Sequence, residues 1–228
     1  MPVISIIIPV YNERERLPAT LAAIGNDKQL EIIVVDGGST DNSPEIARKR
    51  GIMVIASDLG RARQLNKGAE AAKGEILLFL HGDTKLPAGF IEPVVNAMKR
   101  QNFVAGAFQL AIESRRRNVQ WIARLANLRS RFLHLPYGDQ GLFMRATLFR
   151  EIGGYPDLPV MEDFSLVRSL RKKGKIILLE DAVMTSARRW ESLGVFKTTF
   201  INQIMIGGFL LGVSPHLLAN FYRGFQKS

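Results

Sequence analysis

Ile4-Ser5-Ile6-Ile7-Ile8-Pro9-Val10 is a nearly continuous apolar run near the start of the chain, and the polar residues Tyr11-Asn12-Glu13 follow it directly. A short run rich in β-branched residues is typical of a strand that is buried on both faces of a sheet. A second run, residues 32–35, is also followed at once by polar residues, Asp36-Gly37-Gly38-Ser39-Thr40-Asp41. We therefore expect two buried strands, each of which ends in a polar loop.

Helical and strand-like segments alternate through the rest of the first half. We expect helices over residues 16–24, 43–50, 61–72 and 88–100, and strands over residues 53–56 and 75–80. Alternation at this spacing predicts βαβ units with right-handed crossovers. The fold class is therefore α/β, with a mostly parallel central sheet flanked by helices.

The second half has a looser pattern. We expect strands over residues 103–112, 141–144 and 176–179, and helices over residues 119–133 and 162–172. The 119–133 helix is amphipathic, with Trp121, Ile122, Leu125 and Leu128 on one side. The chain has no internal repeat, low-complexity tract or obvious linker, so we expect one domain over residues 1–228 with a C-terminal helical tail.

Composition excludes several classes of protein. Of 228 residues, 46% are hydrophobic and 23% are charged, which is typical of a chain that folds rather than stays disordered. The chain has no cysteine, so it cannot be a disulfide scaffold, a zinc finger or an iron–sulfur protein. It has only three histidines, so any metal must be bound mostly by carboxylate oxygens.

The net charge of +10 indicates an anionic partner, which can be nucleic acid, a membrane surface or a phosphorylated substrate. No nucleic-acid-binding motif accompanies the basic residues, so we expect no nucleic acid partner. The start of the chain lacks the features of a secretory signal. The longest apolar run near the end, residues 204–213, is about half as long as a membrane span. We therefore expect a cytoplasmic protein that does not cross a membrane by itself.

A third polar cluster, His81-Gly82-Asp83-Thr84, follows the strand expected at residues 75–80. In an open parallel sheet, ligands bind beyond the carboxyl ends of the strands, so the three clusters are expected to share one crevice. Taken alone, each can be explained by structure: the acids can cap backbone amides or a helix, and His81 can be a buried structural histidine. Together, they indicate a binding site.

The chemistry of these clusters favours a nucleoside diphosphate. Neither a dinucleotide-binding glycine motif nor a P-loop is present. Carboxylates at strand ends can pair with ribose hydroxyls or a nucleobase, or hold a hard divalent cation through oxygen. Such a cation commonly completes its shell with water and phosphate oxygens.

The quoted segments resemble family 2 glycosyltransferases. The segments after the first two strands are similar to the start of that family, and Leu80-His81-Gly82-Asp83-Thr84 lies where the family has its Asp-x-Asp metal motif. Met161-Glu162-Asp163 resembles its Glu-Asp motif, and Arg188-Arg189-Trp190 resembles its Arg-Trp segment. The match runs from residue 3 to about 191. Gly60-Arg61-Ala62-Arg63-Gln64-Leu65-Asn66, with the His81 segment, looks like a compact bacterial subgroup.

The resemblance implies a GT-A fold, a nucleotide-sugar donor and an inverting transfer. Asp163 would be the general base, with Glu162 beside it, and Asp83 would hold Mg²⁺ or Mn²⁺. The residues implied to bind the donor are Pro9, Tyr11, Glu13, Asp36, Gly38, Arg61, Gln64, His81 and Arg189. The chain departs from the family at His81, which replaces the first acid of Asp-x-Asp. Residues 1–112 would bind the donor and residues 113–192 the acceptor, which can be a saccharide, a lipid or a small molecule.

Two other functions remain open. A sugar nucleotidyltransferase shares a related α/β core, but it would have a Gly-rich segment with Arg and Lys where this chain has Tyr11-Asn12-Glu13-Arg14. A non-catalytic protein that binds nucleotide sugars or membranes would keep the same crevice. The tail, residues 193–228, can dock on an anionic membrane, or it can be a helix pair that covers its own core or a homodimer contact. We favour the second explanation of the tail.

Overall fold

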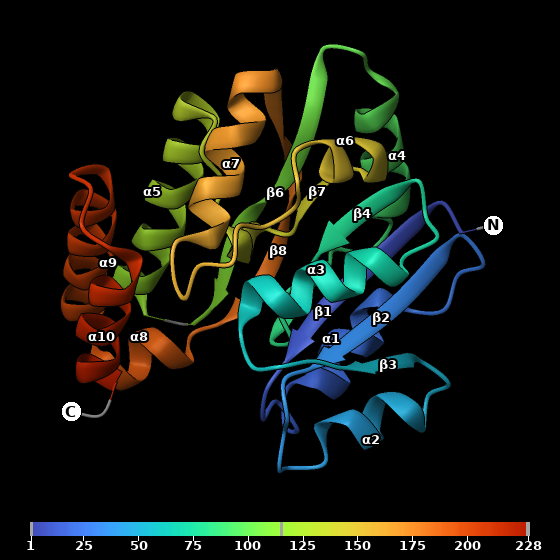
Figure 1. The fold of residues 1–228 in the computed structure, drawn as a ribbon, viewed down its shortest axis with the longest axis horizontal. Helices are drawn as coiled ribbons and strands as arrows, with labels where there is room; N and C mark the ends of the chain where they lie inside the picture. Colours follow the sequence, from blue (N-terminus) through green and yellow to red (C-terminus); the bar gives the residue numbers. More distant parts are fainter. Residues whose placement is uncertain (1, 115, 227–228) are drawn as a thin grey trace.

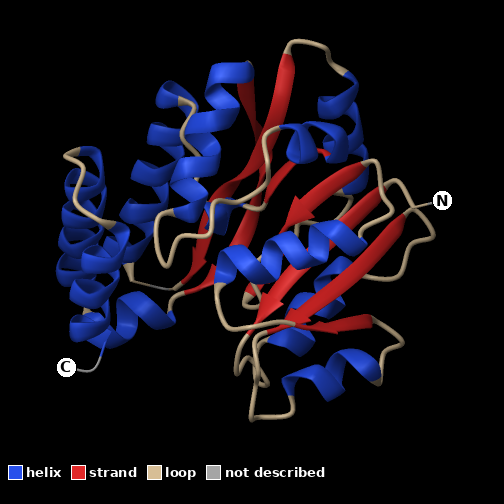
Figure 2. Ribbon diagram, viewed as in Figure 1, coloured by secondary structure: helices blue, strands red, loops and turns tan. Residues whose placement is uncertain are grey.

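The structure is a computed structural model that describes residues 2–114 and 116–226, apart from the side chains of residues 189, 193 and 226. Within these residues one eight-stranded sheet runs in the order β3-β2-β1-β4-β7-β6-β8-β5. Helices cover both faces of the sheet, and a helical hairpin at the C-terminus stands at one end of the molecule (Figures 1 and 2). The expected α/β class with a helical tail is confirmed.

The first half of the sheet is parallel, as expected. β1 (Ile4–Val10) lies between β2 (Leu30–Asp36) and β4 (Ile76–Phe79), and β3 (Met53–Ala56) pairs with the outer side of β2. The register sets Val10 opposite Asp36, so β1 and β2 end together. Their polar loops therefore leave the sheet at the same edge.

The second half of the sheet is mixed. β7 (Leu142–Arg145) runs antiparallel to both β4 and β6 (Phe103–Glu113), whereas β8 (Lys175–Ser186) runs parallel to β6. The short β5 (Thr84–Lys85) closes the sheet against the far end of β8. β8 is longer than the expected strand over residues 176–179, because the strand continues beyond a register shift opposite Ala107–Gln109. Exposed Glu180 and Asp181 interrupt its apolar pattern there.

The helices form two layers. Their bounds are α1 Leu17–Ile24, α2 Ser43–Arg48, α3 Arg61–Ala71, α4 Ile91–Lys99, α5 Arg117–Leu133, α6 Ala146–Glu151, α7 Glu162–Lys173, α8 Arg188–Leu193, α9 Val195–Leu210 and α10 Pro215–Gln226. One core cluster joins α1, α4 and α5 to one face of the sheet, and a second joins α3, α6 and α7 to the other. α4 begins at Ile91 rather than at residue 88, which places Pro93 in the first turn, where its missing N–H costs no helical hydrogen bond.

The amphipathic side of α5 faces solvent. An amphipathic helix ordinarily turns its large apolar side to the core, but Trp121, Leu125 and Leu128 are all more than half exposed. The side that packs on the sheet instead carries small residues, Val119, Ala123 and Ser130. Small residues let the helix backbone approach the sheet closely, so the large side chains are left outside.

The C-terminal tail packs on its own domain through one side. Ile201 and Met205 of α9 and Leu218 of α10 form a small core with Val160 and Met161, which precede α7. The explanation of the tail as a helix pair that covers its own core is therefore confirmed for this inner side. No helix in the described part of the chain is both long enough and apolar enough to span a membrane.

Substitution of two helical glycines, one in α3 and one in α9, tests how α3 packs on the sheet. A Cβ on Gly68 would lie 2.5 Å from Ile7 Cγ2 and 2.9 Å from Val35 Cγ2, whereas one on Gly207 of α9 would meet nothing within 4 Å. We expect Gly68→Ala to lower the free energy of unfolding by about 1–3 kcal/mol through overpacking. Gly207→Ala should raise it by up to about 1 kcal/mol through helix propensity. Urea denaturation measures both, and equal effects would contradict the packing described here.

Candidate active site at the carboxyl edge of the sheet

Hydrogen bonds join the loops that follow β1 and β2. The backbone amides of Asn12, Glu13 and Arg14 donate to Ser39 Oγ, Ser43 Oγ and Asp41 Oδ2, each at 2.9 Å. Asn12 has a φ of +55°, which turns the chain back toward the second loop. Two loops far apart in the sequence therefore form one rigid unit at the end of the sheet.

Asp36 is held in that unit by its own loop. Its carboxylate accepts hydrogen bonds from the backbone amides of Gly38 and Ser39, at 3.1 Å and 3.1–3.2 Å. Gly38 has a φ of +89°, and a Cβ there would meet nothing within 4 Å, so the backbone stays open to a ligand. Capping of backbone amides, expected as the structural explanation of Asp36, is therefore present. It also fixes the carboxylate at the end of β2, where Asp36 is paired with Val10, the residue before exposed Tyr11.

Gln64 connects the ends of β1 and β2 through its side chain. Its side-chain amide is buried and donates to the carbonyl oxygens of Val10 at 2.9 Å and Val35 at 2.8 Å. The Gln64 NH₂ group is therefore used within the protein. These hydrogen bonds give Gln64 a role in positioning the loops, and its expected contact with the donor stays a prediction.

Glu13, Asp83 and Arg188 form the first charged cluster. Arg188 Nη2 lies 2.9 Å from Glu13 Oε1 and 3.9 Å from Asp83 Oδ2. Glu13 Oε2 is buried and accepts no hydrogen bond from the described residues. Burial raises the pKa of Glu13, and nearby Asp83 adds to this, although Arg188 opposes it. Two carboxylates thus converge beside Arg188, and Arg16 Nη1 lies 3.9 Å from Glu13 Oε2.

Asp163 and His81 meet at Gly138. Asp163 Oδ2 accepts a hydrogen bond from the Gly138 amide at 2.9 Å, and Oδ1 accepts one from the Phe164 amide at 2.7 Å. A Cβ on Gly138 would lie 3.2 Å from Asp163 Oδ2 and 3.5 Å from His81 Nε2. Two backbone amides therefore fix the Asp163 carboxylate beside the loop that carries His81 and Asp83.

His81 is neutral in this site. Burial, assisted by the positive charge of Arg61, lowers its pKa to about 3. The departure from the expected Asp-x-Asp pattern therefore replaces a negative side chain with an uncharged one. Asp83 is left as the acid of this segment.

Glu162 forms an ion pair with Arg61. Its buried carboxylate lies 3.3 Å from Arg61 Nη1, and Arg61 also interacts electrostatically with Asp163 and with Tyr222 of α10. Burial raises the pKa of Glu162, and Arg61 opposes this effect. Tyr155 lies close to the same acids, and its pKa is raised well above the usual value by burial and by their charge.

The loop from Tyr137 to Gly141 is braced rather than loose. Gln140 is buried, accepts a hydrogen bond from Ser130 Oγ at 2.7 Å and donates one to Phe108 O at 3.1 Å. The Arg129 guanidinium stacks 3.4 Å from the centre of the Tyr137 ring. The hydrogen bond from the Gly138 amide to Asp163 brings this loop to the candidate site.

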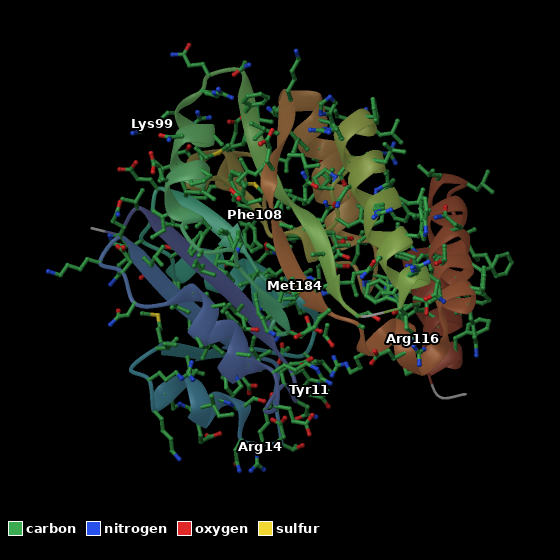
Figure 3. The ribbon with its side chains drawn as sticks, turned by 180° about the vertical axis from the view of Figure 1, so that it is seen from behind. Tyr11, Arg14, Lys99, Phe108, Arg116 and Met184 are labelled. Atoms are coloured by element: carbon green, nitrogen blue, oxygen red, sulfur yellow. The ribbon has the colours of Figure 1, made fainter. Side chains whose placement is uncertain are left out.

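These clusters are linked through the His81–Asp83 loop. His81 lies beside Gly138, Gly82 lies against Glu13 (a Cβ there would be 3.4 Å from Glu13 Cγ), and Asp83 faces Arg188. Figure 3 shows Tyr11 and Arg14 at this end of the strands and Lys99 at the other. An open cavity of about 470 Å³ near Lys99, also lined by Lys73, Arg145 and Arg150, contains none of the candidate residues.

The comparisons with known proteins identify the family and the fold of this chain. Residues 5–153 match the family model described as glycosyl transferase family 2. The chain belongs to this family. Glycosyltransferase AglE of Haloferax volcanii is 37% identical over 94 aligned positions, which cover 36% of this chain and 31% of that protein. An undecaprenyl-phosphate 4-deoxy-4-formamido-L-arabinose transferase of Pseudomonas syringae is 28% identical over 160 positions, 63% of this chain and 46% of that protein. The chain thus spans less than half the length of these family members.

Solved structures show the same GT-A fold as this family 2 chain. S. aureus TarS 1–349 in complex with UDP-GlcNAc has a TM-score of 0.66 and 19% identity, and covers 81% of this chain and 58% of its own. The mannosyltransferase PcManGT of Pyrobaculum calidifontis, in complex with GDP-Man and Mn²⁺, has a TM-score of 0.64 and 19% identity, covering 87% of this chain and 64% of its own.

The family resemblance did not identify Arg188. Its expected neighbour Arg189 follows it in the same helix, but the Arg189 side chain lies outside the described residues. Arg188 reaches the carboxylates because α8 begins just after the end of β8, beside the Asp83 loop. A basic residue that pairs with Glu13 was the signal that could have identified Arg188. The two residues are 175 positions apart, so no local pattern shows this pair.

Gln64→Leu tests the brace beneath this family 2 site. It leaves the carbonyls of Val10 and Val35 without their side-chain donor, so we expect the free energy of unfolding to fall by about 1–3 kcal/mol. The matched control is Gln101→Leu, at an exposed glutamine, which should change it by at most about 0.5 kcal/mol. Urea denaturation measures both variants. If they have equal stability, Gln64 does not hold the strand ends.

Proposed function

We propose that this protein transfers a sugar from a nucleoside-diphosphate sugar to an acceptor hydroxyl, with inversion at the anomeric carbon. The bond from the anomeric carbon to the diphosphate breaks, and a bond to the acceptor oxygen forms. The acceptor proton passes to Asp163, and the nucleoside diphosphate leaves. Family membership supports this reaction over nucleotidyl transfer.

The observation that carries the proposal is the fixed Asp163 carboxylate beside the loop of His81 and Asp83. A general base must be aimed at the proton it removes, and the amides of Gly138 and Phe164 hold Asp163 in one orientation. Glu162 is occupied by Arg61, so we assign it a positioning role rather than that of the base. A single attack that uses one base inverts the anomeric carbon, because the acceptor enters opposite the leaving diphosphate.

The donor is proposed to bind at the loops after β1, β2 and β4. Asp36, Tyr11 and Pro9 would face the nucleoside, and Arg61 would approach the diphosphate. The donor half is proposed as residues 1–112 and the acceptor half as residues 113–192, which carry Gly138 and Asp163. Arg188 of the second part nevertheless reaches Glu13 of the first, so the halves share one centre.

Asp83, with Glu13 beside it, fits a divalent cation such as Mg²⁺ or Mn²⁺. No group of three or more metal-ligating side chains occurs within the described residues. Magnesium is commonly held by one or two carboxylates, with water and substrate phosphate oxygens completing its shell, and these two acids supply that number. The buried Glu13 Oε2 accepts no hydrogen bond from described residues and lies 3.9 Å from Arg16 Nη1, so it would serve as a second ligand. A bound cation would neutralise the charge that develops on the leaving diphosphate.

Asp163→Asn tests the base. The amide keeps the size of the side chain but cannot accept the proton, so we expect donor affinity to be nearly unchanged and turnover to fall at least about a hundredfold. Donor binding is measured by calorimetry and turnover by release of nucleoside diphosphate. Asp157→Asn is the matched control. Asp157 is an exposed acid on the connection that leads into α7, and it pairs with Arg63 of α3. Near-normal turnover of the Asp163 variant would assign the base elsewhere.

Asp83→Asn tests the cation. We expect Mn²⁺ to strengthen donor binding by the unaltered protein and to lose this effect in the variant, because one carboxylate ligand is removed. Calorimetry with and without Mn²⁺ measures the difference. Glu113→Asn, at an exposed acid paired with Lys85, is the control. An unchanged response to Mn²⁺ in the Asp83 variant would remove the metal assignment.

A further inference from the structure

A row of large apolar side chains runs along the solvent side of α5. Trp121, Leu125, Leu128 and Phe132 are spaced three or four residues apart and are between 54% and 70% exposed. That spacing places them on one stripe of the helix, opposite the small residues that pack on the sheet. Soluble proteins rarely display such a continuous apolar stripe unless it binds something.

The outer side of the C-terminal hairpin, α9 and α10, also exposes large apolar side chains. Phe196 and Phe200 of α9, and Leu217 and Phe221 of α10, are exposed, and so is Leu211 between the two helices. Figure 1 shows α5, α9 and α10 at the same end of the molecule, away from β2 and β3. We call these exposed residues of α5, α9, α10 and their connection the apolar end.

All charges on these segments are positive. No Asp or Glu occurs between Glu113 and Asp139, nor after Glu191. Arg117, Arg124 and Arg131 are seven residues apart and exposed, so they flank the stripe of α5 along one side. The hairpin adds the exposed Lys197 and Arg223. The charged side chains that these segments themselves contribute to the apolar end are thus all cationic.

The apolar end adjoins the candidate active site. The inner side of the hairpin packs on Met161, which has a φ of +66° and immediately precedes Glu162 and Asp163. Phe209 of α9 packs edge-on against Phe164 at a ring distance of 5.8 Å. The hairpin that carries part of the apolar end therefore packs next to the Asp163 side of the site.

We propose that the apolar end docks on an anionic lipid bilayer. Exposed aromatic and aliphatic side chains enter the interface between headgroups and acyl chains, while the basic rim contacts lipid phosphates. A second copy of this chain would instead bring two cationic rims together, which charge repulsion disfavours. Docking in this orientation would present the Asp163 side of the site to the membrane, so under the proposed function the acceptor would be a lipid-borne hydroxyl.

Vesicle co-sedimentation tests the docking. We expect the protein to sediment with vesicles of phosphatidylcholine and phosphatidylglycerol, to bind pure phosphatidylcholine more weakly, and to be released as salt rises. Leu125→Ser with Phe132→Ser should weaken binding about tenfold or more, because apolar area is lost. Arg124→Gln with Arg131→Gln should also weaken it about tenfold or more, because two headgroup contacts are lost.

The controls alter the same chemistry elsewhere on the surface. Met53→Ser removes an exposed apolar side chain from β3, and Arg171→Gln with Lys172→Gln removes two exposed charges from the end of α7. Both should bind vesicles as the unaltered protein does. Equal losses in the control and test variants would overturn the proposal. A dimer in analytical ultracentrifugation that the Leu125 and Phe132 changes dissociate, with no vesicle binding, would overturn it as well.

Tryptophan fluorescence gives an independent readout. The chain has two tryptophans, and Trp121 is 59% exposed whereas Trp190 is 8% exposed. Trp190 Nε1 has no hydrogen-bond partner among the described residues, so Trp190→Phe removes no such contact and leaves Trp121 as the sole reporter. We expect its emission to shift to the blue with anionic vesicles and to be quenched by brominated lipids. An unchanged spectrum would contradict docking, and because no sugar donor is needed, this result is independent of glycosyl transfer.

Discussion

The parallel pairing of β1 with β2 and β4 is the constraint on which the candidate site depends. These strands are buried on both faces, and their hydrogen bonds fix a common direction, so their carboxyl ends meet at one edge of the sheet. The loops that leave this edge carry Glu13, Asp36 and Asp83. Gln64 then ties β1 to β2 from beneath, which gives these loops a firm base.

The second half of the chain brings the remaining groups to this edge by a different route. β8 pairs with β6 along most of its length and ends opposite Thr84, so α8 begins beside the Asp83 loop and delivers Arg188. α7 begins at Glu162, and the Gly138 amide holds Asp163 on the side of Gly138 that His81 also approaches. The site is thus a junction of two differently built parts of one sheet.

Charge balance explains why so many acids can lie together. Arg188 faces Glu13 and Asp83, and Arg61 faces Glu162 and Asp163. His81 is neutral because burial lowers its pKa to about 3, so it adds no charge to the cluster. Under the proposed function, the donor diphosphate would meet guanidinium groups on both sides of the cluster. The hairpin contributes structurally, since its inner side packs on Met161 next to these acids.

The amino-acid sequence by itself determined the α/β class, the order of most elements, the family resemblance and the loops that carry Asp36, Asp83 and Asp163. These features follow from local patterns, because apolar periodicity and strand-end acids are written in short segments. Tertiary structure alone decided that Gln64 faces inward, that Arg188 meets Glu13 and that β8 continues past residue 179. It also decided that α5 presents Trp121 and its row to solvent. Either side of α5 could pack on the sheet. The side with small residues packs there because it allows the helix to approach the sheet more closely.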